Sequence, residues 1–548
     1  MTLIRYMAIH LSPAAGPWRR LRTPLAGTAL LAMGLLPQVP AARALVYRPV
    51  FPAGNQKYIL TPPPSKKPYF NNARVFGVRP GSPFLFTLAV SGMRPMQFSA
   101  AGLPAGLRLN AQTGQISGVL TPAEIGPHTV RFRASNARGI ATGKLTIVVG
   151  NTIALTPPMG WNSWNCWAGA VDQSRVLAAA RAMVSSGLVN YGWTYICIDD
   201  TWQAGRGGPW NAIQPVKSRF PDMHGLARQI HGMGLKFGIY STPWTTSYAG
   251  HVGGSSMNKR GVWHRPRISK KGRLNRNILP WAIGKYHFET QDARQWAAWG
   301  VDYLKYDWNP IRYPEVHRMY QALRHCGRDV VLSLSNSAPY KGAAKWIPDA
   351  NLWRITGDSR DNWPNLRGHW QAGAKWAHLQ SPGHWNDPDM MTIGWVGWGK
   401  HQHYTHLTPN EQYVEVSAFA LMGAPLILGN NLSRMGAFTR NLLTNSEVIA
   451  VDQDPLGVAG RPVFRHGGRQ VWVKPLADGS MALGLFNLGS RPARVTVSWR
   501  RLHVHGARVV RDLWRQKNIG IAASRVTARV GPHGVVLLEI SKKQAGDL

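Results

Sequence analysis

Short apolar runs alternate with amphipathic segments between residues 151 and 455. Each apolar run has the length of a buried strand, and in the segments between them apolar residues recur every three or four positions, as on one face of a helix. Eight strands are expected, at Met159–Trp164, Tyr195–Asp200, Leu235–Ser241, Val301–Trp308, Asp329–Asn336, Leu352–Asp358, His384–Met390 and Pro425–Asn431. Helices are expected at Asp172–Ser186, Glu289–Trp299, Pro314–Cys326 and Pro409–Leu421. Eight β/α units in about 300 residues predict a (β/α)₈ TIM barrel, whereas the alternative, a doubly wound open sheet, needs fewer strands.

The pattern changes to a period of two on both sides of this region. Residues 79–150 contain short alternating runs separated by Gly, Pro, Asn and Asp, which predicts a small N-terminal β-sandwich. Residues 456–548 alternate again, which predicts a C-terminal antiparallel β-sandwich. Trp472, Trp499 and Trp514 of this last part are expected in its core.

The first 44 residues have the organisation of a secretory signal. A basic stretch at 19–22 precedes an apolar run at 25–36, and the small-x-small sequence at 42–44 is typical of a cleavage site. The apolar run is too short to span a bilayer, and no other run approaches the necessary length of about 20 residues. We expect an exported chain, periplasmic or secreted, cleaved near Ala44. Residues 45–78, rich in Pro and aromatic side chains, are expected to form an extended connector.

Composition and charge exclude several classes of protein. With 44% hydrophobic and 16% charged residues, the chain is neither disordered nor fibrous. Its 64 Lys and Arg against 25 Asp and Glu give a formal charge of +39, but the basic residues are spread along the chain, except in a loop at 259–276. Without a nucleic-acid-binding fold signature, we expect no nucleic-acid partner. Because few carboxylates are available to protonate, we expect tolerance of an acidic medium; a stability maximum near neutral pH would contradict this.

Cysteine usage excludes a disulfide framework. The chain has 3 cysteines, Cys166, Cys197 and Cys326, which allow at most one bridge. They also lack the paired spacing of a zinc site.

Carboxylates gather where the predicted barrel strands end. Six aspartates follow four of the apolar runs: Asp199, Asp200, Asp307, Asp358, Asp387 and Asp389. One such aspartate could simply cap a helix, but six from a chain with 25 acidic residues indicate a site. Catalytic groups of a barrel lie at the carboxyl ends of its strands. The sequence therefore predicts a carboxylate-lined pocket at this end of the barrel.

Paired carboxylates suit the cleavage of a glycosidic bond. One carboxylate attacks the anomeric carbon while the other protonates the leaving oxygen. Metal binding by the same aspartates is the competing chemistry, but Lys305 and Arg354 come from the same strand ends and would repel a divalent cation. The two cations are also expected to lower carboxylate pKa values and to donate hydrogen bonds to sugar hydroxyls. No metal or other cofactor is therefore expected.

Aromatic side chains are concentrated in the same region. Of 24 Trp, 20 fall between residues 161 and 398. Trp161, Trp164, Trp202 and Trp308 lie at or beside predicted strand ends, where a flat apolar face can stack on a pyranose ring.

Several motifs, in order across some 300 residues, resemble glycoside hydrolase family 27, which contains α-galactosidases (melibiases) and α-N-acetylgalactosaminidases. The motifs are Thr-Pro-Pro-Met-Gly-Trp-Asn-Ser-Trp at 156–164, Cys-Ile-Asp-Asp at 197–200, Lys-Phe-Gly-Ile-Tyr at 236–240, Leu-Lys-Tyr-Asp at 304–307, Gly-His-Trp-Asn-Asp-Pro-Asp-Met at 383–390 and Asp-Gln-Asp-Pro-Leu-Gly at 452–457. The resemblance includes the family's β-sandwich after the barrel. Residues 102–118 resemble immunoglobulin-like modules attached to bacterial glycoside hydrolases.

The resemblance implies roles for individual residues. Asp307 matches the family's nucleophile and Asp358 its acid/base, in a mechanism that retains the anomeric configuration. Asp199 and Asp200 match the pair that binds the distal hydroxyls of the sugar. Other sugar contacts are implied at Trp164, Tyr240, Lys305, Arg354 and Asp389.

The chain departs from the family pattern at two places. Tyr248 and Asn309 stand where members from higher organisms have a pair of cysteines, so that bridge is absent. The fifth strand end contains Ser335 and Asn336, and it lacks the glutamate associated with galactose at the sugar's C2. Small residues there could leave room for an N-acetyl group.

The sequence as a whole predicts a retaining α-galactosidase that releases terminal α-linked galactose from oligo- or polysaccharides. The enzymatic alternatives are α-N-acetylgalactosaminidase and β-L-arabinopyranosidase, the latter because arabinopyranose shares the ring hydroxyls of galactose but lacks its C6 arm. The intact pair Asp199 and Asp200 favours galactose. The alternative from another class is a catalytically inactive carbohydrate-binding protein.

Overall fold

An eight-stranded parallel sheet forms the centre of the protein. The computed structural model describes residues 44–49, 58–262 and 281–542. The strands pair in the order β21-β20-β19-β18-β15-β12-β11-β24. Their bounds are β11 Met159–Asn162, β12 Tyr195–Cys197, β15 Lys236–Ser241, β18 Tyr303–Asp307, β19 Val331–Ser335, β20 Leu352–Arg354, β21 Trp385–Asp387 and β24 Leu426–Leu428. A parallel bridge between Met391 and Leu428 links the chain just after β21 to β24, so the predicted barrel is confirmed.

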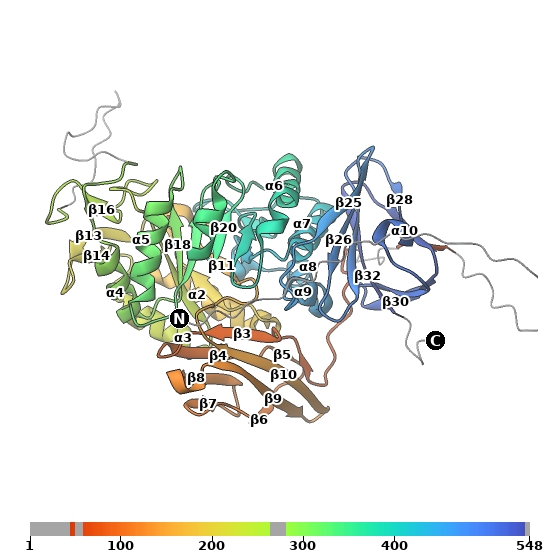
Figure 1. The fold of residues 1–548 in the computed structure, drawn as a ribbon, viewed down its shortest axis with the longest axis horizontal. Helices are drawn as coiled ribbons and strands as arrows, with labels where there is room; N and C mark the ends of the chain where they lie inside the picture. Colours follow the sequence, from red (N-terminus) through yellow and green to blue (C-terminus); the bar gives the residue numbers. More distant parts are fainter. Residues whose placement is uncertain (1–43, 50–57, 263–280, 543–548) are drawn as a thin grey trace, which may run out of the picture. The chain divides into compact units, whose positions relative to one another are not determined.

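Helices follow the strands and lie outside the sheet, as α4, α5 and α6 do in Figure 1. Their bounds are α1 Trp164–Trp167, α2 Gln173–Ser185, α3 Met223–Gly232, α4 Glu289–Trp299, α5 Tyr313–Arg324, α6 Trp363–Trp376, α7 Pro409–Met422, α8 Ala437–Leu443 and α9 Ser446–Asp452. Side-chain hydrogen bonds to the backbone fix the residues at which several of these helices begin. Asp172 accepts a hydrogen bond from the backbone of Arg175 at the start of α2, and Thr408 with Glu411 forms a capping box on α7.

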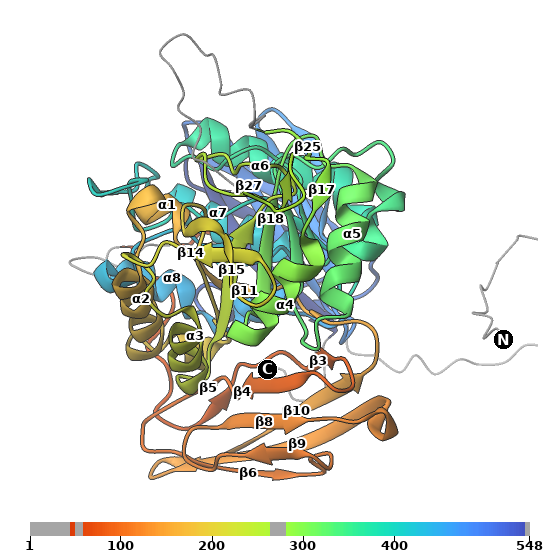
Figure 2. The ribbon, with the colours of Figure 1, turned by 90° about the vertical axis from the view of Figure 1, so that its left-hand side faces the viewer.

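Two sheets packed face to face form the part before the barrel, drawn in red-orange to orange in Figure 2. One sheet has the order β3-β10-β9-β6 and the other β4-β8-β7, and apolar residues of both share one core. The strands are β3 Val75–Val78, β4 Pro83–Thr87, β6 Gln97–Ala101, β7 Leu107–Leu109, β8 Gln115–Val119, β9 Gly126–Asn136 and β10 Gly139–Val149. Because β3 pairs with β10, this sandwich includes residues from the predicted connector.

The C-terminal part consists of two further sheets with a common core. A six-stranded sheet has the order β25-β26-β27-β32-β29-β30, and a smaller one has the order β1-β31-β28. The strands are β1 Leu45–Tyr47, β25 Arg461–His466, β26 Arg469–Pro475, β27 Met481–Asn487, β28 Ala493–Ser498, β29 Arg508–Asp512, β30 Lys517–Ala522, β31 Arg525–Val530 and β32 Gly534–Lys542, with the short helix α10 Trp499–Leu502. Trp472, Trp499 and Trp514 are buried, as expected.

In the described parts of the chain, four pairs of short strands form two-stranded sheets outside the larger sheets. They are β2 Tyr69–Phe70 with β5 Val90–Ser91, β13 Gln203–Gly207 with β14 Ala212–Pro215, β16 Ser255–Ser256 with β17 Tyr286–His287, and β22 Trp395–Val396 with β23 His403–Tyr404. Most of the predicted basic loop at 259–276 lies outside the described residues. Cys166, Cys197 and Cys326 are all free thiols, so the one bridge that the sequence allowed does not form. Among the residues that the structure describes, no helix is both long and apolar enough to cross a membrane.

A buried arginine joins the N-terminal sandwich to the barrel. The guanidinium of Arg79 forms an ion pair with Asp329, at the amino end of β19, and also donates to the carbonyl oxygens of Leu323 and Arg328 at 3.3 and 2.7 Å. Ser82 Oγ donates to the same carboxylate at 3.0 Å. This end of the barrel is opposite the strand ends that carry the six aspartates, so the contact leaves the predicted pocket open.

Candidate active site

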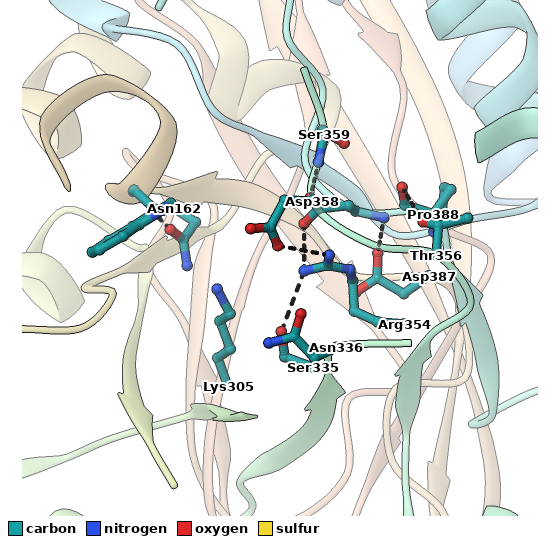
Figure 3. A network of polar contacts seen from close by, with 12 residues as sticks. Asn162, Lys305, Ser335, Asn336, Arg354, Thr356, Asp358, Ser359, Asp387 and Pro388 are labelled. Carbon is teal, nitrogen blue, oxygen red and sulfur yellow. Dashed lines mark hydrogen bonds and ion pairs between the residues drawn. The ribbon is translucent and has the colours of Figure 1, made fainter. Parts of the chain in front are cut away.

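The carboxyl ends of the central strands bring most of the predicted site residues together. Asp307 is the last residue of β18, and Lys305 lies two positions before it on the same face of the strand. Asn336 follows β19 directly, and Arg354 ends β20. In Figure 3, the side chains of Lys305, Asn336, Arg354 and Asp358 converge on one space. Parallel strands of one barrel end at the same edge, which explains why residues distant in sequence meet here.

Arg354 connects three groups of the pocket. Its guanidinium lies 3.1 Å from Asp358 Oδ1, 2.9 Å from Asp389 Oδ1 and 3.2 Å from Ser335 Oγ. Asp389 is held in turn by the backbone NH of Ser359, at 2.7 Å. Because Arg354 is buried and pairs with several carboxylates, it stays charged and fixes their positions.

A second group of contacts surrounds Asp307. Asn336 Nδ2 donates to Asp307 Oδ1 at 2.6 Å, and Lys305 Nζ lies 2.8 Å from Asp199 Oδ2. Asn336 has a positive φ of 73°, a left-handed backbone that is costly for a residue with a side chain. This conformation at the end of β19 is compatible with the short bond that orients one oxygen of Asp307.

The two carboxylates expected to act on the sugar differ in exposure. Asp307 is buried, with 6% of its surface exposed, whereas 59% of the Asp358 side chain is exposed. Burial raises the pKa of Asp307 to about 6, and the nearby charges of Lys305 and Arg354 offset this only in part. The two cations therefore act on Asp307 in the expected direction, but the cost of desolvating the charged form is larger, so the pKa of Asp307 stays above its ordinary value.

Asp358 behaves in the opposite way. Burial acts to raise its pKa, but the charges of Arg354 and Lys305, together with the hydrogen bond from Arg354, outweigh burial and hold the pKa below its ordinary value. Here the expected effect of the two cations is confirmed, because the exposed carboxylate keeps much of its hydration.

The residues expected to bind the far side of the sugar line the pocket from β12 and β15. Asp200 accepts hydrogen bonds from the backbone NH groups of Ala249 and Thr201 at 3.0 and 2.6 Å. Burial raises the pKa of Asp200 to about 6. Tyr240 is buried at the end of β15, and burial and the neighbouring carboxylates Asp200 and Asp307 raise the pKa of its phenol.

Three of the four tryptophans expected to stack on a sugar are core residues. Trp161 and Trp202 have no exposed surface and Trp308 has 1%, so none of them offers a free ring face. Trp161 and Trp202 also donate their indole NH groups to backbone carbonyls, of Asn430 and Tyr240. Trp164 is half-buried at the start of α1, where Asn162 Oδ1 accepts a hydrogen bond from the backbone NH of Trp164 at 2.9 Å. Of the four tryptophans, Trp164 is therefore the one whose ring can still stack on a sugar.

Sequence reasoning gave no role in the site to Tyr248. This residue lies in the loop after β15, and 40% of its surface is exposed. Burial and the charges of Asp307 and Asp358 raise the pKa of its phenol, and its hydroxyl interacts with the side chain of Asn336. It therefore stands close to both carboxylates. The only sign of Tyr248 in the sequence was its position, eight residues beyond Tyr240, near the point where family members from higher organisms have a cysteine.

Comparison with known proteins agrees with the division into an Ig-like part, a barrel and a C-terminal sandwich. A family model described as "Alpha galactosidase A" matches residues 156–262 and 275–454, and one described as "Alpha galactosidase C-terminal beta sandwich domain" matches residues 466–540. A model for an Ig domain matches residues 67–150.

Individual relatives cover most of the chain. Alpha-galactosidase 2 of Arabidopsis thaliana is 34% identical over 73% of this chain and 93% of its own length. A solved structure from Bacteroides fragilis is 30% identical, with a TM-score of 0.76, over 88% of this chain and 99% of that one. A GH27 β-L-arabinopyranosidase from Geobacillus stearothermophilus is 28% identical, with a TM-score of 0.62, over 72% of this chain and 98% of that one.

Proposed function

The chain belongs to the alpha-galactosidase family, glycoside hydrolase family 27, and from this membership we propose that it hydrolyses terminal α-linked galactose with Asp307 as nucleophile and Asp358 as acid/base. The observation that carries the assignment of roles is the pair of environments around the two carboxyl groups. Asp307 is buried and oriented by Asn336, as a nucleophile needs to be. Asp358 is more exposed and stands at the rim, where a leaving group departs.

The reaction follows the retaining double displacement of the family. Asp307 attacks the anomeric carbon and forms a β-linked glycosyl enzyme, while Asp358 protonates the oxygen of the departing group. Asp358, now a carboxylate, then removes a proton from water, and the oxygen of this water attacks the anomeric carbon and releases Asp307. The sugar leaves with its original α configuration because it is inverted twice.

The other polar residues have supporting roles. Lys305 and Arg354 place positive charge next to the carboxylates and can donate hydrogen bonds to sugar hydroxyls. Asp199, Asp200 and Asp389 are buried acceptors, and Tyr240 and Trp164 provide aromatic surface. Ser335 and Asn336 stand where the family distinguishes substituents at C2.

Discrimination at C2 is tested by comparing matched substrates. Ser335 is held by Arg354, and Asn336 is held by Asp307, so neither side chain is free to move aside for an N-acetyl group. We expect purified protein to hydrolyse an aryl α-galactoside at least about tenfold faster, in kcat/KM, than the matching α-N-acetylgalactosaminide. Faster turnover of the N-acetyl substrate would contradict the proposal. Preference for an aryl β-L-arabinopyranoside would place the chain with its Geobacillus relative instead.

The pH dependence of kcat/KM should depend on the leaving group. Asp307 must be ionised and Asp358 protonated, and the pKa of Asp307 is about 6 while that of Asp358 is held below its ordinary value. With a poor leaving group, the fraction of enzyme in the required state is greatest between the two pKa values, so we expect a maximum below pH 6 and a decline above it. With a leaving group that needs no proton, only the ionisation of Asp307 counts, and kcat/KM should rise through about pH 6 to a plateau. Superimposable profiles for both substrates would contradict the roles.

We also propose that residues 1–44 are removed on export and that residues 79–150, 151–455 and 456–548 form the Ig-like module, barrel and C-terminal sandwich. The expected connector, 45–78, contributes β1 to the C-terminal sandwich and β3 to the Ig-like module. The first strand, β1, begins at Leu45, directly after the predicted cleavage site, and pairs with β31. Amino-terminal sequencing of the exported protein should therefore begin at or near Leu45. An exported chain that retains residues 1–44 would contradict this.

A further inference from the structure

Asp361, His403 and His406 form a cluster outside the residues that we assign to the sugar. Asp361 lies in the loop between β20 and α6, His403 belongs to β23, and His406 follows that strand. His403 Nε2 is 3.0 Å and His406 Nδ1 2.9 Å from the same carboxylate oxygen, Asp361 Oδ2. One possible ligand atom from each residue lies within 4.8 Å of the other two. We propose that these three side chains bind a divalent transition-metal ion of the zinc class.

The donor set selects this class of ion. Two imidazole nitrogens and one carboxylate oxygen suit Zn²⁺ and similar ions, whereas Mg²⁺ and Ca²⁺ prefer oxygen ligands. An ion about 2.1 Å from each donor separates tetrahedral ligand atoms by about 3.4 Å. From the separations of 2.9 and 3.0 Å, each histidine therefore has to move away from Asp361 by about 0.4–0.5 Å.

The cluster is buried on the side of Asp361 and exposed on the side of the two histidines, so it combines a fixed ligand with a path by which an ion can enter. The Asp361 side chain is 10% exposed, and Asp361 Oδ2 also accepts a hydrogen bond from the backbone NH of His406 at 3.0 Å. The side chains of His403 and His406 are 38% and 71% exposed. The buried carboxylate is thus preorganised, while the solvent side of the cluster leaves room for a water molecule as fourth ligand.

The alternative explanation of the same contacts is a hydrogen bond from the ring NH of each histidine to Asp361, with the imidazole neutral or protonated. Metal binding needs the lone pair of the nitrogen that faces Asp361, and in such a hydrogen bond this nitrogen carries a proton. The two explanations therefore separate by whether an added ion displaces these protons and binds at one site per chain.

The position of the cluster also suggests what the ion does. The loop that carries Asp361 begins after β20 and includes Asp358 and Ser359, and the backbone of Ser359 holds Asp389. An ion shared with His403 and His406 ties this loop to the β22–β23 hairpin. The ion takes no part in the displacement at the anomeric carbon, so binding is measurable in the absence of any substrate.

Binding of Zn²⁺ and Co²⁺ to purified protein without a histidine tag, at pH 7.5, tests the proposal. Calorimetry with Zn²⁺ should give one site per chain, and Co²⁺ should show the visible absorption of a low-coordinate nitrogen and oxygen site. We expect His403→Ala and His406→Ala each to weaken binding about tenfold or more, since even residues that only support metal ligands contribute 10–100-fold. The matched control is His401→Ala, which removes an exposed histidine of the same loop outside the cluster and should bind as the unaltered protein does.

Three outcomes would overturn the proposal: no saturable binding of either ion, equal binding by the His406→Ala variant, or an equal loss in His401→Ala. The first or second would leave the cluster as hydrogen bonds from the histidines to Asp361, and the third would indicate nonspecific binding to the loop. Because His406 is the most exposed of the three, its replacement should leave the metal-free melting temperature unchanged, which separates a lost ligand from a lost fold.

Discussion

Replacing Asp307 by glycine should reduce the hydrolysis of an aryl α-galactoside by about 10⁴-fold or more. Without this carboxylate no glycosyl enzyme can form, and no other carboxylate shares its place at the end of β18. The measurement is kcat/KM for an activated aryl α-galactoside, with folding checked by the melting temperature. Loss of a buried carboxyl whose pKa is raised by burial should not destabilise the fold strongly.

Azide makes this experiment specific for a nucleophile. In the Asp307→Gly variant, azide can enter the space left by the side chain and attack the anomeric carbon once, as the aryl group leaves. The product should then be a β-galactosyl azide, with the configuration inverted. Asp349→Asn serves as the control, because Asp349 pairs with His317 at 2.8 Å, away from the pocket. Near-full activity of Asp307→Gly, or an α-configured azide from it, would contradict the assignment.

Replacing Asp358 by glycine should give a loss that depends on the leaving group. For substrates that leave as poor, strongly basic alkoxides, removal of the general acid should cost about 10²–10⁴-fold in kcat/KM. For an aryl group that leaves without protonation, formation of the glycosyl enzyme should stay fast. Hydrolysis of the glycosyl enzyme should then be slow, because no base activates the water. Comparing kcat/KM and kcat across a series of aryl leaving groups measures both effects.

The product formed with azide again distinguishes the role. In the Asp358→Gly variant, azide needs no general base and should attack the glycosyl enzyme on Asp307, restore kcat and give an α-galactosyl azide. The opposite product configurations from the two variants would then identify nucleophile and acid/base within one chain. A loss equal for all leaving groups, without rescue by azide, would indicate that Asp358 only positions Arg354, its partner at 3.1 Å.

In the free protein, the group that has to be ionised has the higher pKa, and the group that has to be protonated has the lower one. The proposed nucleophile, Asp307, needs to be ionised and has the higher pKa, of about 6, and the proposed acid, Asp358, needs to be protonated and has a lowered pKa. A small fraction of the free enzyme therefore carries both groups in the required state, and that fraction is greatest in acid. A bound sugar excludes water from Asp358, which acts to raise its pKa.

The sequence by itself determined the architecture and the positions of the carboxylates. The barrel strands were predictable because buried parallel strands are continuous apolar runs, and helices such as α4 follow a period near 3.6 between them. Asp307 and Arg354 could be assigned to one pocket because the carboxyl ends of parallel strands meet at one edge. The family motifs supplied the roles that we propose for these residues.

The tertiary structure alone decided which side chains are free to act. Trp161, Trp202 and Trp308 lie at or beside strand ends, as Trp164 does, but packing against neighbouring strands and loops buries all three. The pKa of Asp307 depends on burial, which the adjacent sequence does not encode. Asp361 meets His403 and His406 from more than 40 positions away because the β20–α6 loop and the hairpin after β21 fold over the same rim. Burial and contacts between loops are set by the whole chain at once, so no local pattern of residues could have predicted them.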